Sequence, residues 1–131
     1  MIGLDTNILI RYFTQDDDAQ YAAAAKVINA LTPDLPGFVS QIVIAELMWV
    51  CQFSYHFKKQ ELEHVVEKLL RSKELVVERA EIVAQSLVKF RHSRANFADC
   101  LIERCSQAAG CEYTLTFDKG AVSGGMQLLE T

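Results

Sequence analysis

Four acidic side chains lie where an ordinary surface charge is not expected, and they are Asp5, Glu46, Asp99 and Asp118. Asp5 and Asp118 each end a short apolar run, Glu46 lies inside the run IVIAELMWV, and Asp99 falls in the first turn of a predicted helix. Carboxylates that converge repel one another, and their pKa values rise unless a cation lies among them. Oxygen ligands alone select hard divalent ions such as Mg²⁺ or Mn²⁺. Such ions commonly serve phosphoryl transfer.

Glu46 is the acid whose surroundings are least polar in sequence. Its neighbours three and four positions away on a helix are all apolar: Ile42, Val43, Trp49 and Val50. We therefore expect Glu46 to need a cation or a hydrogen-bond donor, because a buried carboxylate without a partner is costly. The alternatives are an exposed edge or an ion pair with an arginine. By the same spacing we expect Trp49 to pack in the core.

The other three acids also have plain structural explanations, which stay open at this point. Asn96 and Asp99 have the spacing of a capping box at a helix start, while Asp5 and Asp118 have the positions of turn or cap residues after strands. Glu103, four residues after Asp99, is either an acid that supports Asp99 or the partner of a neighbouring arginine.

The elements that would position these acids alternate between strand and helix, which predicts an α/β fold with a mostly parallel sheet. Ligands bind such sheets beyond the carboxyl ends of the strands, and this is where Asp5 and Asp118 would lie. We expect Thr6 or Asn7 to cap the first helix. Strands are predicted at 2–4, 38–39, 74–77, 113–116 and 126–129, and helices at 7–13, 19–31, 41–53, 58–70, 80–90 and 96–110.

The totals indicate one globular domain over residues 1–131. The net charge is −4, and leaving out the four acids gives −4 + 4 = 0, which is compatible with a phosphodiester substrate once metal is bound. The four cysteines show no zinc-like spacing and are expected to be reduced. No apolar run approaches a membrane span and no secretory signal is visible, so we expect a cytoplasmic protein with no membrane partner.

Four motifs in one order resemble the PIN-domain ribonucleases, and most closely the VapC toxins of toxin–antitoxin pairs. They are LDTNIL around Asp5, IAEL around Glu46, FADCLI around Asp99 and TFDK around Asp118. The resemblance implies a three-layer α/β/α sandwich around a central, mostly parallel sheet. It also implies that the protein is a toxin that hydrolyses internal phosphodiester bonds of RNA with a metal-activated water. In this family the catalytic residues, which also bind Mg²⁺ or Mn²⁺, would be Asp5, Glu46, Asp99 and Asp118.

The resemblance also assigns supporting residues and partners. Thr6 and Asn7 would orient Asp5, and Thr116 would hold a water on the metal or a phosphate oxygen. The chain would form a homodimer and be inhibited by a small VapB-like antitoxin. One departure is visible, because many relatives carry an aromatic residue three positions after the last acid, where this chain has Ala121. This difference puts the conformation of the last turn in question.

Basic and aromatic side chains suggest where RNA and protein partners would bind. The stretch KFRHSR is the only dense basic run, and we expect Arg91 and Arg94, with Lys119, to bind RNA phosphates. The plainer alternative for the two arginines is a solvated helix end. We expect some of Phe53, Tyr55 and Phe57 to be exposed and to receive an antitoxin helix or a second subunit.

Three other functions fit the sequence less well. A catalytically inactive PIN fold that binds nucleic acid or protein would not need the intact set of four acids. A phosphatase of the HAD type also begins with an aspartate after its first strand, but it needs a second acid two residues later, where this chain has Asn7. The paired acids of a response-regulator receiver are absent as well.

Overall fold

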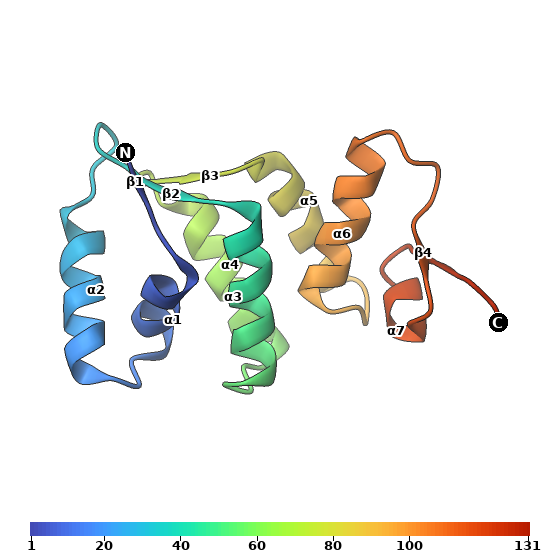
Figure 1. Cartoon of the computed structure of the whole chain (residues 1–131), viewed down its shortest axis with the longest axis horizontal. Coiled ribbons are helices and arrows are strands. Elements are labelled where there is room, and N and C mark those ends of the chain that lie inside the picture. The colour runs from blue at the N-terminus through green and yellow to red at the C-terminus, as the bar shows by residue number, and fades with distance from the viewer. The chain divides into compact units, whose positions relative to one another are not determined.

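The computed structural model describes all 131 residues (Figure 1). The chain forms two compact units, Met1–Ala80 and Glu81–Thr131, and each is described by itself. The prediction of one domain over 1–131 stays a prediction. The first unit contains β1 (Ile2–Gly3), α1 (Thr6–Thr14), α2 (Asp18–Ala30), β2 (Gly37–Val39), α3 (Gln41–Phe53), α4 (Lys59–Arg71) and β3 (Leu75–Val77). The remaining elements are α5 (Ala80–Arg91), α6 (Phe97–Ala108), β4 (Leu115–Thr116), α7 (Lys119–Val122) and β5 (Gln127–Leu128).

The first unit is built on a parallel sheet in the order β1-β2-β3. Ile2 pairs with Gly37, and Gly37 pairs with Leu75 in the next strand. Gly37 is buried in the central strand, where a Cβ would lie 2.9 Å from side-chain atoms of both Leu4 and Leu31. A larger residue at this position would force these leucine side chains to move. Since β4 and β5 also pair in parallel, the prediction of an α/β fold with parallel strands is confirmed.

Two helices follow each of the first two strands and supply most of the core of the first unit. The connections are needed because parallel strands cannot be joined by a tight turn. α1 packs against α2 and α3, and α3 packs against α4. The side chains that these helices bury completely or almost completely are Leu9, Ile44, Leu47, Met48, Cys51, Leu62, Val66 and Leu69. No helix of the structure is both long and apolar enough to cross a bilayer.

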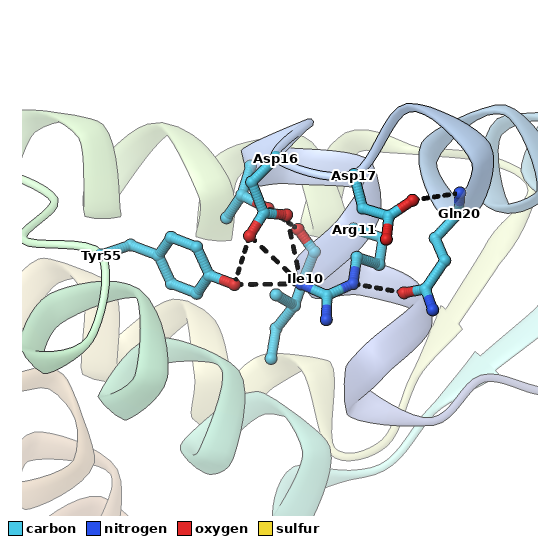
Figure 2. Close-up of polar contacts among 7 residues, drawn as sticks. Ile10, Arg11, Asp16, Asp17, Gln20 and Tyr55 are labelled. Carbon is cyan, nitrogen blue, oxygen red and sulfur yellow. Dashed lines mark hydrogen bonds and ion pairs between the residues drawn. The ribbon is translucent and has the colours of Figure 1, made fainter.

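A polar network fixes the turn between α1 and α2, as Figure 2 shows. Arg11 donates to Asp16 at 3.1 Å and to the Tyr55 hydroxyl at 3.0 Å, and that hydroxyl donates to Asp16 at 2.8 Å. The hydrogen bond from Tyr55 is the largest cause that holds the pKa of Asp16 below its usual range. Gln15, at φ 55°, ends α1 in the left-handed region. The network therefore ties the end of α1 to the segment that follows α3.

The second unit has a small core between α5 and α6. Phe90 meets Phe97 edge to face, with ring centroids 5.8 Å apart. Val83, Leu87 and Cys100 are buried with them. The loop before α6 is tied to the turn after α7, because the backbone N–H of Arg94 donates to Ser123 Oγ at 3.0 Å. This bond joins the loop before α6 to the connection between β4 and β5.

Most element positions agree with the sequence prediction to within a few residues, but some local predictions are wrong. The cap of α1 is Asp5 itself, whose carboxylate accepts from Thr6 N–H, rather than Thr6 or Asn7. Trp49 is 54% exposed rather than packed in the core. The short helix α7 was not predicted, although Asp118 has the position expected of its cap. Of the three aromatic residues expected at a surface, Phe53 is 47% exposed, while Tyr55 and Phe57 are half-buried.

The packing of α3 gives a direct test of the first unit. Leu47 is fully buried, so Leu47→Ala should lower the free energy of unfolding by about 2–5 kcal/mol, through lost burial and the cavity left behind. Ile42 on the same helix is 81% exposed, and Ile42→Ala should change that free energy by less than about 0.5 kcal/mol. Urea denaturation followed by circular dichroism measures both. Equal losses for the two variants would contradict this orientation of α3.

Candidate metal-binding residues

Asp5 lies directly between the first strand and the first helix. Leu4 N–H continues the strand ladder by donating to Phe38 O at 2.9 Å, and the next residue, Asp5, begins the helix. One carboxylate oxygen of Asp5 accepts from Thr6 N–H at 2.8 Å. Its other oxygen accepts no hydrogen bond within the protein and the side chain is exposed. The aspartate is therefore held by the helix start and still has a free oxygen for a ligand.

Thr6 is 3% exposed, and its hydroxyl is buried without a hydrogen-bond partner. A buried polar group without a partner costs about 1–3 kcal/mol. An unpaired hydroxyl at this position, next to Asp5, is a feature that a bound water or ion would explain. Asn7 is exposed at the first turn of α1.

Glu46 lies in the middle of α3 and is exposed, so the expected burial of this carboxylate is not found. No side-chain hydrogen bond or ion pair engages it. Ile42 and Trp49, one turn before and after it, are also largely exposed. The apolar residues predicted to surround Glu46 on the helix do so, but they form part of an exposed face of α3 rather than of the core.

Asp99 belongs to the first turn of α6 and completes only half of the predicted capping box. Asn96 accepts from Asp99 N–H at 2.8 Å, but the Asp99 carboxylate makes no hydrogen bond in return. Burial, and then the negative charge of Asp118, raise the pKa of Asp99 above its ordinary value. Because nothing in the second unit neutralises this carboxylate, Asp99 is an acid without a structural partner.

Asp118 lies directly before α7 and caps it. One carboxylate oxygen accepts from Gly120 N–H at 2.8 Å, and the backbone N–H of Asp118 donates to Thr116 Oγ1 at 3.0 Å. Ala121 is buried and its N–H donates to Asp118 O at 3.1 Å, so the last turn closes without the aromatic residue of many relatives. The second carboxylate oxygen of Asp118 accepts no hydrogen bond.

The structure brings one pair of the four acids together. Asp99 and Asp118 lie close enough in the second unit for their charges to repel, while Asp5 and Glu46 belong to the first unit. Neither unit by itself gathers three or more acidic, histidine or cysteine side chains into a metal-binding group. The donor chemistry fits Mg²⁺ or Mn²⁺, because all four groups are carboxylates and a cation would relieve the repulsion between Asp99 and Asp118.

The basic residues expected to contact RNA are all exposed: Arg91, Arg94 and Lys119. Two further cations matter in the second unit. Lys89 begins the basic run noted in the sequence but was not assigned a role there, and Arg104 was not identified. Both contact Glu103, with Lys89 Nζ and Arg104 Nε each 2.7 Å from Glu103 Oε1. Of the two explanations given for Glu103, the structure supports the ion pair with an arginine and adds a lysine to it.

Comparison with known proteins gives one match. The sequence profile of the PIN domain family matches residues 2–123, which is nearly the whole chain and includes all four acids. No curated protein matches the chain.

The repulsion between the two acids of the second unit can be measured. In Asp118→Asn, the pKa of Asp99 should fall, because one cause of its raised value is removed. It should stay above the ordinary value, because burial is the larger cause. Carbon NMR of the carboxyl groups against pH measures this, with Glu112→Gln, an exposed acid of the same unit, as the control. An unchanged pKa in Asp118→Asn would mean that the two carboxylates do not interact.

Proposed function

Because the chain belongs to the PIN domain family, we propose that it is a Mg²⁺- or Mn²⁺-dependent endoribonuclease similar to the VapC toxins. Proteins of this family are generally nucleases and typically use divalent metal ions. The observation that carries the proposal is the Asp99–Asp118 pair, in which two carboxylates repel each other and neither is paired with a cation.

In this proposal the metal ligands are Asp5, Glu46, Asp99 and Asp118. Each has at least one oxygen that accepts no hydrogen bond within the protein, which supports a role outside the fold itself. When bound, the ion would lower the pKa of a coordinated water and stabilise the leaving oxygen of the RNA. Thr6, whose backbone N–H donates to Asp5, and Asn7 would orient Asp5. Thr116, whose Oγ1 accepts from the backbone N–H of Asp118, would hold a water on the metal or a phosphate oxygen.

In the second unit, RNA would meet positive charge near Asp99 and Asp118 in the chain. Arg91 and Arg94 lie shortly before α6, which carries Asp99, and Lys119 directly follows Asp118. We assign all three to phosphate contacts, which supply affinity without reading sequence. The protein would act as a toxin in the cytoplasm, under the control of an antitoxin.

The nuclease proposal predicts a specific pattern of loss. Wild-type protein with Mn²⁺ should cut a circular single-stranded RNA, which has no ends and is opened only by an endonuclease. Asp5→Asn and Asp99→Asn should each lower the rate by at least about 100-fold, because each loses a metal ligand. Asp34→Asn, an exposed acid in a loop, is the control and should cut at the wild-type rate. Gel electrophoresis follows cleavage, and calorimetry follows Mn²⁺ binding.

Other outcomes would distinguish the alternatives. Chelation of the metal should stop cleavage by the wild type. If Asp5→Asn and Asp99→Asn bind Mn²⁺ and cut as the wild type does, the acids are structural and the proposed site is wrong. If the wild type binds RNA without cutting it at any metal concentration, the chain is a nucleic-acid-binding PIN fold.

A homodimer is the second part of the proposal, and the exposed face of α3 supports it. Ile42, Trp49 and Phe53 lie along that face, and the rings of Trp49 and Phe53 are in contact with centroids 5.1 Å apart. Exposed apolar side chains that cluster in this way are typical of protein interfaces. An antitoxin helix that binds the same face would either displace the second copy or bind beside it.

Light scattering tests the dimer. Wild-type protein should have the mass of two chains, and Phe53→Glu should have the mass of one, because a charge is placed in the apolar contact. Ile102→Glu, which alters an exposed apolar side chain of α6, should remain dimeric. A monomeric wild type, or a dimeric Phe53→Glu, would show that this face does not join two copies.

A further inference from the structure

Glu103 is a buried carboxylate that two cations share. It is 8% exposed, and Lys89 Nζ lies 2.7 Å from its Oε1. Arg104 binds it with two parallel hydrogen bonds, from Nε to Oε1 at 2.7 Å and from Nη2 to Oε2 at 2.9 Å. These bonds, that of Arg104 most of all, lower the pKa of Glu103. The acid is therefore ionised at neutral pH and neutralises one positive charge.

Two cations on one carboxylate leave a net charge of about +1, and neither cation has used all its donors. Lys89 carries three N–H donors and Arg104 carries five. Both side chains line a hollow of the second unit, whose other lining residues are Gln85, Val88, His92, Ser93 and Ser123. No carboxylate lines this hollow, although the chain as a whole has a net charge of −4. It is thus a cationic surface in an acidic protein.

The backbone turn at Gly125 lies directly against the Lys89 side chain. Gly125, in the turn before β5, has φ +105°, and a Cβ at this position would lie 2.6 Å from Lys89 Nζ and 3.4 Å from Glu103. The missing side chain lets the turn lie directly against the ion pair. Lys89 and Arg104 are therefore bound to Glu103 on one side, and on the other side they line the hollow.

We propose that this hollow binds a phosphodiester group of the RNA strand, outside the metal-binding acids, through Lys89 and Arg104. The inference rests on the proposed function and extends it to a second contact with the same substrate. Glu103 follows Asp99 by four residues, which is slightly more than one helical turn, or about 6 Å along α6. With one phosphate at Asp99 and Asp118, a neighbouring phosphate of the strand would lie at the two cations. The planar guanidinium of Arg104 suits phosphate oxygens, and Lys89 adds a mobile point charge.

The test measures how RNA affinity depends on salt, in chelator and without divalent ions, so that neither cleavage nor the metal contributes. A labelled single-stranded RNA is titrated by fluorescence anisotropy into wild type, Lys89→Gln and Arg104→Gln. Each variant loses one phosphate contact, so the slope of log K against log salt should become shallower by about 0.7. At about 0.15 M salt this corresponds to about fourfold weaker binding. Lys26→Gln, an exposed lysine of the first unit, should match the wild type.

Two more variants separate phosphate binding from a purely structural role. Lys89→Arg keeps the charge and should keep the wild-type slope. Glu103→Gln removes the neutralising charge and should steepen the slope by about 0.7, which tightens binding. If the ion pair only stabilised the fold, Glu103→Gln would weaken RNA binding as the cation variants do. Thermal melts by circular dichroism verify that each variant is folded at the temperature of the titration.

Three results would overturn the inference. If wild type cuts circular RNA but Lys89→Gln and Arg104→Gln bind RNA with the wild-type affinity and slope, the hollow is not an RNA contact and the nuclease proposal stands. If inorganic phosphate raises the melting temperature of the wild type but not of Lys89→Gln, while RNA binding is the same in both, the hollow takes a free anion. If the wild type neither binds nor cuts RNA, the inference and the proposed function both fail.

Discussion

The shortness of the parallel strands is the constraint on which the rest of the structure depends. No strand exceeds three residues, so the chain turns from strand to helix almost at once. Each such turn needs a side chain that satisfies the free N–H groups of the helix. Asp5 before α1 and Asp118 before α7 both do this with one oxygen of the carboxylate. The second carboxylate oxygen of each aspartate accepts no hydrogen bond within the protein. Each aspartate is therefore both a helix cap and a candidate metal ligand.

Asp99 and Glu103 show how neighbouring acids on one helix acquire opposite electrostatic roles. They are separated by about one turn of α6, but the pKa of Asp99 is raised and that of Glu103 is lowered. Burial raises the pKa of both acids. At Asp99 the charge of Asp118 adds to the effect of burial, whereas at Glu103 the bonds from Arg104 and Lys89 outweigh it. An acid that is neutralised within the protein contributes to the fold. An acid that is left with a like charge has free energy to gain from an external cation.

The sequence alone identifies the elements well and the polar contacts poorly, for a physical reason. Periodicity and caps predict helices such as α3 and α4 because these patterns are local. The exposure of Trp49 could not be predicted in this way, since α3 is apolar on nearly every side and only tertiary packing decides which side is buried. The contact between Lys89 and Glu103 joins residues on two helices, and no local signal specifies it. Asp99 was identified as a possible ligand, but only the structure shows that its carboxylate does not cap the helix.

Trp49 is the only tryptophan of the chain and lies on the exposed face of α3. Its emission therefore comes from a ring that is already in contact with water in the folded chain. In a single copy of the chain, intrinsic fluorescence will consequently change little when the core melts, and a flat signal in a denaturation experiment would not mean that the protein is unusually stable. The same ring lies one turn from Glu46, so its spectrum will respond when another molecule covers this face. A change in the emission of Trp49 would therefore report that this face has been covered, rather than that the core has melted.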